Sequence, residues 1–233
     1  MEKHGTVPKK DTTRQALEFG AAVLKQLPRL EPEDMQYWIK NQGKLQEVLA
    51  NALSIPDPRL EWQRFCEEVF GIKTDFSELV LPEKQEGFNW LLVMLEGMTA
   101  NRIFDKCKER FQSWRYTDDF NTISSVRKTD KTYAIWLRDR VEADEENKAL
   151  SANKCQELGI NGITLEERML LELWYHWKTG KHLDINNVTL CTGSRYSDGG
   201  VPSVDWYDDG MFVDYYNPGD ADDDLRTRSA VSL

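Results

Sequence analysis

Two short apolar segments constrain the fold of this chain more than any other feature of its sequence. Residues 88–95 and Tyr133–Leu137 are apolar almost throughout, and each is only long enough for one strand. A short, continuous apolar run is typical of a strand that is buried on both faces of a sheet. Between the two runs, Ile103, Phe104 and Cys107 recur at helical spacing. The order strand, helix, strand predicts a βαβ unit with a parallel pair of strands.

Helix signals stand on both sides of these runs. Apolar residues at helical spacing predict several short helices within residues 11–72. Further along the chain, Thr164 and Glu167 have the spacing of a capping box, in which each side chain bonds a free backbone N–H at the helix start. This pattern predicts a helix over residues 165–178, ended by Gly180.

The last third of the chain has the pattern of strands. Residues 204–207 and 211–215 flank an Asp-Asp-Gly turn, which predicts an antiparallel hairpin, and residues 187–191 predict one further strand. We therefore expect an α+β or α/β protein, with a helical N-terminal region followed by a mixed β-sheet domain with packed helices and a C-terminal hairpin. The expected divisions are a disordered arm at 1–10, a helical region at 11–80 and the mixed domain at 81–233.

The chain carries no pattern of a membrane or secreted protein. Its longest apolar stretch is about six residues, whereas a membrane-spanning helix needs about 20. The first ten residues are polar and lack the apolar stretch of a signal peptide. The four cysteines are far apart and match neither a zinc motif nor a disulfide framework. We therefore expect a cytoplasmic protein without a membrane partner.

Negative charge is concentrated near the C-terminus. The segment from Asp198 to Asp224 holds nine aspartates and no Lys, Arg or Glu, so it accounts for almost all of the formal net charge of -10. Residues 101–140 are locally basic and contain several aromatic side chains, a combination that binds single-stranded nucleic acid in some proteins. The overall pI near 4.9 nevertheless argues against a dedicated nucleic-acid binder.

Several segments of the chain are similar to those of other proteins. The chain resembles an uncharacterised group of bacterial hypothetical proteins, for which we know of no established activity. The resemblance covers roughly residues 92–233 and implies a bacterial cytoplasmic setting, but it supplies no catalytic residue. It is carried by Tyr133–Glu146, Gly162–Arg168, Thr179–Asp184, Thr189–Arg195 and Val201-Pro202, with a further similarity over residues 38–53.

Two stretches contain side chains suited to chemistry or binding. His176, His182 and Asp184 are candidates for the site of a metal-assisted hydrolase, although their spacing matches no established metal motif. A charged stretch directly follows the second apolar run, at the place where parallel sheets bind ligands. Together with two residues further on, it gives the candidate binding residues Arg138, Asp139, Arg140, Glu142, Asp144, Arg195 and Asp198.

The charge layout, without a catalytic motif, favours a binding function. We expect a bacterial cytoplasmic interaction protein that uses its acidic C-terminal surface and the charged loop at residues 138–146 to bind a partner protein. The alternative is the metal-assisted hydrolase around residues 176–198. The sequence identifies no cofactor and no particular metal.

Overall fold

The computed structural model describes residues 12–53 and 57–233, which divide into two units after residue 55. The expected disordered arm at residues 1–10 lies outside the described residues. The helix at residues 58–70 belongs to the second unit, whereas the sequence patterns place a boundary near residue 80. An apolar helical stripe in the sequence does not indicate which neighbour it packs against, so the two divisions differ.

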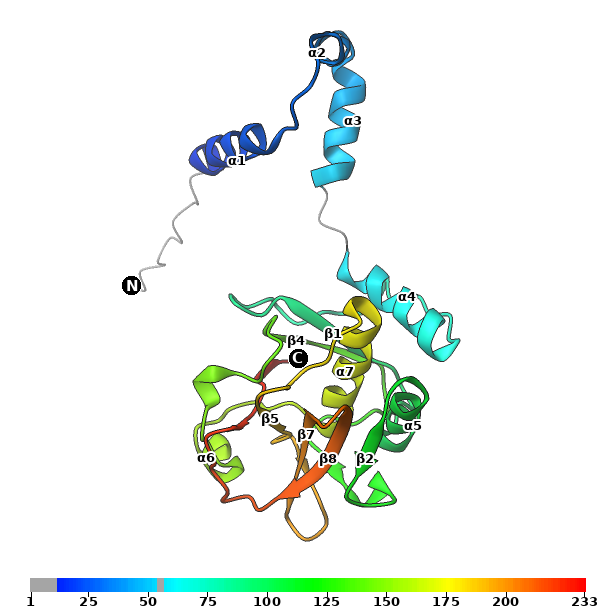
Figure 1. The fold of residues 1–233 in the computed structure, drawn as a ribbon, viewed down its shortest axis with the longest axis vertical. Helices are drawn as coiled ribbons and strands as arrows, with labels where there is room; N and C mark the ends of the chain where they lie inside the picture. Colours follow the sequence, from blue (N-terminus) through cyan, green and yellow to red (C-terminus); the bar gives the residue numbers. More distant parts are fainter. Residues whose placement is uncertain (1–11, 54–56) are drawn as a thin grey trace, which may run out of the picture. The chain divides into compact units, whose positions relative to one another are not determined.

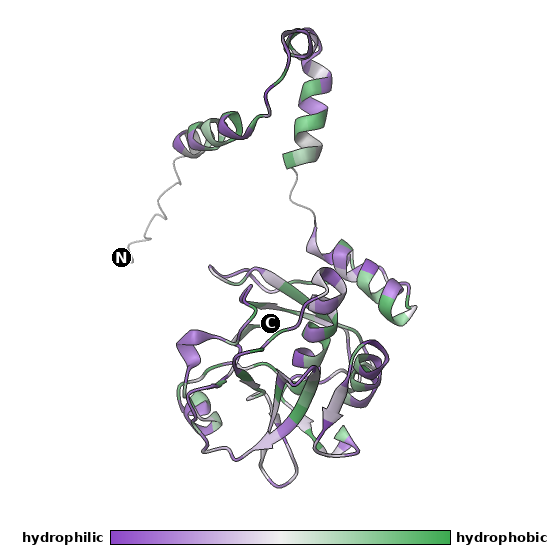
Figure 2. Ribbon diagram, viewed as in Figure 1, coloured by the Kyte–Doolittle hydropathy of each residue, from purple (hydrophilic) through white to green (hydrophobic). Residues whose placement is uncertain are grey.

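The first unit consists of α1 (Thr12–Gln26), α2 (Pro32–Lys40) and α3 (Gln42–Leu53) (Figure 1). These helices confirm the short helices expected from apolar spacing. Figure 2 shows hydrophobic and hydrophilic residues alternating along α1 and α3. No residue of this unit whose exposure is described is buried, and Leu17 is 72% exposed.

The second unit is built around α7 (Leu165–Thr179) (Figure 1). This helix contacts α4 (Pro58–Phe70), α5 (Ala100–Arg110), β1 (Trp90–Met94) and β7 (Val201–Tyr207). The capping box is present as predicted, with Thr164 and Glu167 bonding each other's backbone N–H, and Gly180 ends the helix in the left-handed conformation. Almost every residue of its first three turns is buried. A helix that is enclosed on all sides in this way forms the core of its unit.

The first sheet has the strand order β1-β4-β10, from β1 (Trp90–Met94), β4 (Tyr133–Leu137) and β10 (Ala230–Val231). Both apolar runs are therefore buried strands, as predicted. The predicted parallel βαβ pair is wrong, because β1 and β4 pair antiparallel. After α5 the chain enters β2 (Ser113–Arg115) in a different sheet, so α5 is not a crossover between β1 and β4.

The second sheet has the order β2-β8-β7-β5-β9, with β5 (Val188–Leu190) and β9 (Leu225–Arg226) at one side. The predicted hairpin is present as β7 (Val201–Tyr207) and β8 (Gly210–Tyr216), which pair antiparallel. A third, two-stranded sheet joins β3 (Ser124–Ser125) to β6 (Ser194–Arg195), and α6 (Ala152–Glu157) packs on β5 and β7. With antiparallel pairing dominant, the fold is α+β.

Candidate functional site

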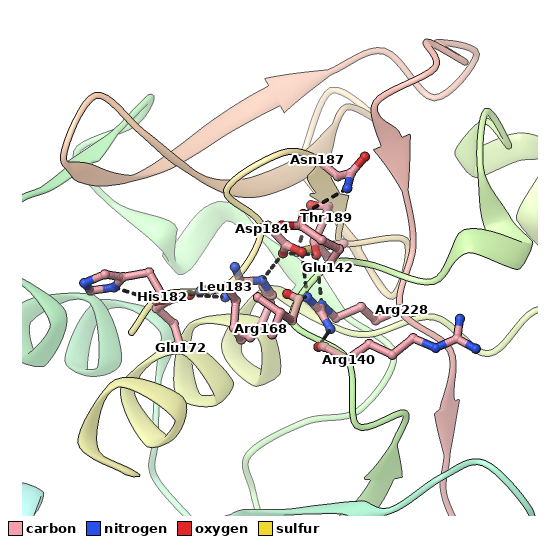
Figure 3. A network of polar contacts seen from close by, with 12 residues as sticks. Arg140, Glu142, Arg168, Glu172, His182, Leu183, Asp184, Asn187, Thr189 and Arg228 are labelled. Atoms are coloured by element: carbon pink, nitrogen blue, oxygen red, sulfur yellow. Dashed lines mark hydrogen bonds and ion pairs between the residues drawn. The ribbon is translucent and has the colours of Figure 1, made fainter. Parts of the chain in front are cut away.

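Asp184, one of the three residues predicted for a hydrolase site, belongs to a buried cluster of opposite charges. We call this cluster the ionic core: Arg168, Glu172, Asp184 and Arg228 (Figure 3). Arg168 on α7 donates from Nε to Asp184 Oδ2 at 2.8 Å and from Nη1 to Glu172 Oε2 at 2.9 Å. Arg228 donates to the other Asp184 oxygen at 2.6 Å. All four side chains are at most 2% exposed, so each charge is compensated inside the protein and not by water.

Polar neighbours saturate Asp184. Thr189 Oγ1 hydrogen-bonds its carboxylate, and Arg228 Nε donates to that same hydroxyl at 3.2 Å. Burial alone would raise the pKa of Asp184, but Arg228 and Arg168 outweigh it and hold the pKa below its usual range. Asp184 is therefore an ionised carboxylate enclosed by two arginines, an arrangement suited to joining the loop at residue 184 to α7.

The two histidines extend the ionic core toward aromatic side chains. His182 Nδ1 lies 2.9 Å from Glu172 Oε1, and its ring stacks between Trp206 and His176. Burial, followed by the nearby His182, lowers the pKa of His176. Over residues 12–53 and 57–233, no group of three or more His, Cys, Asp or Glu side chains has a metal-binding arrangement.

The charged loop at residues 138–146 lies beside this core, as the Asp184 backbone N–H donates to the Val141 carbonyl at 3.2 Å. Within the loop, Arg138 bonds the buried Asp144 at 2.6 Å, and Arg140 lowers the pKa of Glu146 to about 2. Glu142 and Asp139 are also engaged, since they accept hydrogen bonds from Asn186 and Asn187 and from Asn89, respectively. The fold thus brings the loop close to Asp184, but most charged side chains of the loop already have hydrogen-bond or ion-pair partners within the protein.

The remaining two candidates lie elsewhere in the unit. Arg195 on β6 donates from Nη1 to the carbonyls of Thr192 and Ser194 at 2.9 and 2.7 Å, and no acidic partner is present among the described residues. Asp198 accepts the Gly200 backbone N–H at 3.0 Å and so shapes the turn before β7. The structure therefore does not bring these residues into the charged loop.

A different surface combines the acidic segment with exposed aromatic rings. We call it the acidic face: Trp114 on β2, Asp205 and Tyr207 on β7, and Phe212 and Asp214 on β8. Strand pairing places Trp114 and Asp205 opposite Phe212, whose ring centroid is 5.6 Å from that of Trp114. The alternate residues Val204, Met211 and Val213 belong to the core on the side of α7, so the acidic face is the opposite side of the sheet.

Part of that sheet side is covered and part is open. Ala152 of α6 packs with Leu190, Val201 and Tyr216, which closes the part formed by β5 and the start of β7. At the other end Tyr207 is 68% and Trp114 45% exposed. The residues predicted from sequence did not include these aromatic side chains, although the alternation of Phe212 and Asp214 in a predicted strand places them on one face.

The aspartates of the acidic segment form no ion pairs within the part of the chain that the structure describes. Among the described residues, none of the nine aspartates from Asp198 to Asp224 forms an ion pair, whereas acids elsewhere do so often. Burial raises the pKa of Asp205 to about 6 against the opposing effect of Arg168, with Asp184 and Asp214 acting in the same direction as burial. Burial and Asp224, Asp205 and Asp214 likewise raise the pKa of Tyr216. The acidic face thus holds aspartates that form no ion pair among the described residues.

Comparison of the chain with models of protein families, with curated proteins and with solved structures finds no match. None of the described helices combines the length and the apolar composition that crossing a membrane requires.

Proposed function

We propose that this protein is a binding protein of the bacterial cytoplasm that captures a Lys/Arg-rich segment of a partner protein on the acidic face. The observation that carries the proposal is the pairing of exposed aromatic rings with aspartates that form no ion pair among the described residues. The acidic segment was expected to bind a partner, and the aromatic rings add a second chemistry to that expectation.

Charge favours a basic partner in two ways. Unpaired carboxylates on one surface attract a cationic segment over the Debye length, which raises the association rate at low salt. Asp205 gains most from such a partner, because a cation nearby favours the ionised form that burial disfavours. Binding of a basic segment therefore offsets the free-energy cost of burying the ionised Asp205 carboxylate in the free protein.

The aromatic rings select for cations that also stack. Trp114 and Phe212 lie in contact, and Tyr207 meets Phe212 edge-on at 6.0 Å between ring centroids. Arginine and lysine side chains bind the faces of such rings, Trp most favourably, with about 0.5–1 kcal/mol at exposed sites. The acidic face thus offers both carboxylates and ring faces to one extended basic segment.

The metal-assisted hydrolase stays the alternative prediction. Its candidate carboxylate, Asp184, is fully buried and bonded to two arginines, and His182 faces Glu172 and Trp206. Asp184 would have to leave both arginines to bind a metal, so the geometry of this region supports a structural role better than a catalytic one.

The proposal is tested by fluorescence anisotropy with a labelled oligoarginine peptide, using oligoglutamate as the negative probe. Asp205→Asn/Asp214→Asn should weaken oligoarginine binding by about fivefold to tenfold, and Trp114→Ala by a further few-fold. The matched control is Asp105→Asn/Asp130→Asn, two exposed aspartates elsewhere whose side chains make no hydrogen bond or ion pair within the described residues. Equal weakening by both double variants would show that net charge alone drives binding and would overturn the proposal.

A further inference from the structure

A separate cavity of about 460 Å³ opens beside the two-stranded sheet of β3 and β6. Polar groups from Ser124, Ser125, Thr192 and Asn161 line one part of it, and Ala152, Cys155 and Ile160 line another. A volume in this range is typical of small-molecule sites, which combine apolar walls with a few directed polar groups. We call this cavity the Arg195 pocket.

Arg195 is the charged residue among those lining the pocket, and no acid joins it there. Its Nη1 is fixed by the Thr192 and Ser194 carbonyls, while Nε and Nη2 make no hydrogen bond within the described part of the chain. Arg195 is half-buried, and burial lowers its pKa. A half-buried guanidinium without a counter-charge favours the arrival of an anion.

The walls near Arg195 are held rigidly. Ser125 Oγ lies 2.8 Å from Glu166 Oε2 and 2.7 Å from Ser194 Oγ, and the Leu165 backbone N–H donates to Ser194 Oγ at 2.9 Å. At Gly193 a Cβ atom would lie 2.7 Å from the Gly162 carbonyl oxygen, so only glycine permits this close approach. These contacts tie the pocket to the start of α7 and preform it.

We propose that the Arg195 pocket binds a small organic oxyanion, a carboxylate or phosphate group carried on an apolar body. Arg195 holds the oxyanion through Nε and Nη2 in the planar fork that suits both groups. The hydroxyl groups of Ser124 and Thr192 supply neutral polar contacts, and the α6 side of the pocket, at Ala152 and Cys155, covers the apolar body.

This site is independent of the acidic face. It is formed by β3, β6, α6 and residues 160–162, whereas the acidic face is formed by β2, β7 and β8. The two sites also call for ligands of opposite charge. Failure of one proposal therefore leaves the other standing, and a single titration with each probe separates them.

The test titrates the isotopically labelled full-length protein with phenyl phosphate, benzoate and neutral benzyl alcohol, following backbone amide signals by NMR. Saturable shifts are expected at Gly162 and Gly193 with at least one of the two anions. Arg195→Gln should weaken that binding by about tenfold or more, because hydrogen bonds to charged groups contribute at least this factor. Arg102→Gln, which removes an exposed arginine of α5, is the charge-matched control and should leave binding unchanged.

A second variant guards against unfolding of Arg195→Gln, whose Nη1 contacts support the loop. Gln156→Trp places a large ring at the pocket from an exposed position on α6 without removing a hydrogen bond of the described chain, and it should also abolish binding. Binding of phenyl phosphate alone would identify a phosphate ligand, and of benzoate alone a carboxylate. The proposal would be overturned if neither anion gave saturable shifts, or if benzyl alcohol bound as tightly as the anions. It would also be overturned if folded Arg195→Gln and Gln156→Trp bound the anion as tightly as the native protein.

Discussion

Arg168 is a guanidinium that is completely enclosed by protein, so its neighbours decide whether the core can form. Moving an unpaired charge into the interior costs several kcal/mol even after relaxation. Glu172 lies one turn away on the same helix, but Asp184 and the second arginine, Arg228, come from distant parts of the chain. The ionic core therefore stabilises one specific arrangement of three segments.

Replacing Asp184 by Asn should destabilise the protein by about 3–5 kcal/mol, since two arginines would remain buried with too little negative charge. Urea unfolding followed by circular dichroism measures the loss as a lower transition midpoint. Asp105→Asn on the exposed side of α5 is the control and should change stability by less than about 0.5 kcal/mol. An Asp184→Asn midpoint equal to that of the native protein would contradict a structural role for the ionic core.

The raised pKa of Asp205 makes its contribution to stability fall with rising pH, whereas the contribution of most aspartates rises with pH. Its pKa is raised from 3.8 to about 6, so the native protein holds this proton more tightly than the unfolded chain. The stability due to the protonated carboxyl is fully present below about pH 4 and is lost as the pH rises through 6. Asp205→Asn should therefore remove this decline and raise stability at pH 7 by on the order of 2 kcal/mol.

The measurement for Asp205 is a series of urea midpoints between pH 4 and pH 7 for the native and Asp205→Asn proteins. The difference between them should grow with pH. A constant difference across this range would show that the native carboxyl titrates normally. If the acidic face binds a basic segment, oligoarginine binding at pH 6 should also release protons from the native protein, and less from Asp205→Asn.

At the scale of elements, the β7–β8 hairpin turns on two aspartates. Tyr207 pairs with Gly210, so Asp208 and Asp209 are the central residues, and both have positive φ angles, 45° and 66°. Glycine adopts this conformation with the least strain, and asparagine and aspartate tolerate it at some cost. The hairpin was predicted from its Asp-Gly pair, but the glycine lies one position after the turn and begins β8.

The double substitution Asp208→Asn/Asp209→Gly, which gives the turn an Asn-Gly pair, should stabilise the hairpin by about 0.5–1 kcal/mol. Differential scanning calorimetry would show a higher melting temperature. The change leaves Asp205 and Asp214 in place, so it also tests how far the turn charges contribute to oligoarginine binding. A lower melting temperature would indicate that the two carboxylates stabilise the native turn.

Local signals predicted individual elements well and their pairing poorly. Thr164 and Glu167 act within one helical turn, so the start of α7 was predictable from its own residues. The direction of β1 relative to β4 depends on where the chain goes after α5, and no residue of either strand encodes it. The same applies to the site: Arg168 and Arg228 meet only in the folded chain, and the exposure of Trp114 depends on how far α6 covers the sheet.

At the scale of the whole molecule, the second unit contains every buried residue that the structure describes. Trp62 of α4 stacks on Trp174 of α7 at 5.9 Å between ring centroids, so α4 is required for this core although it precedes the first strand. The first unit carries apolar residues that are largely exposed, and none of its described side chains contributes to the core.

A fragment of residues 57–233 should therefore fold cooperatively, with a melting temperature within a few degrees of the full chain. Thermal unfolding followed by near-ultraviolet circular dichroism measures this, because the tryptophans of the core report its packing. A fragment starting at residue 81, where sequence patterns place the boundary, is the comparison and should lose the cooperative transition. Cooperative melting of that shorter fragment would show that α4 is dispensable.

Residues 227–231 form a short segment that contributes to both the ionic core and the first sheet. This segment completes the ionic core with Arg228 and covers the edge of β4 with Ala230–Val231. A protease that trims the chain before Thr227 would leave Asp184 short of one cation and an apolar strand open to other chains. Molecules that lack residues 227–231 should thus unfold more readily and aggregate more than molecules that keep them.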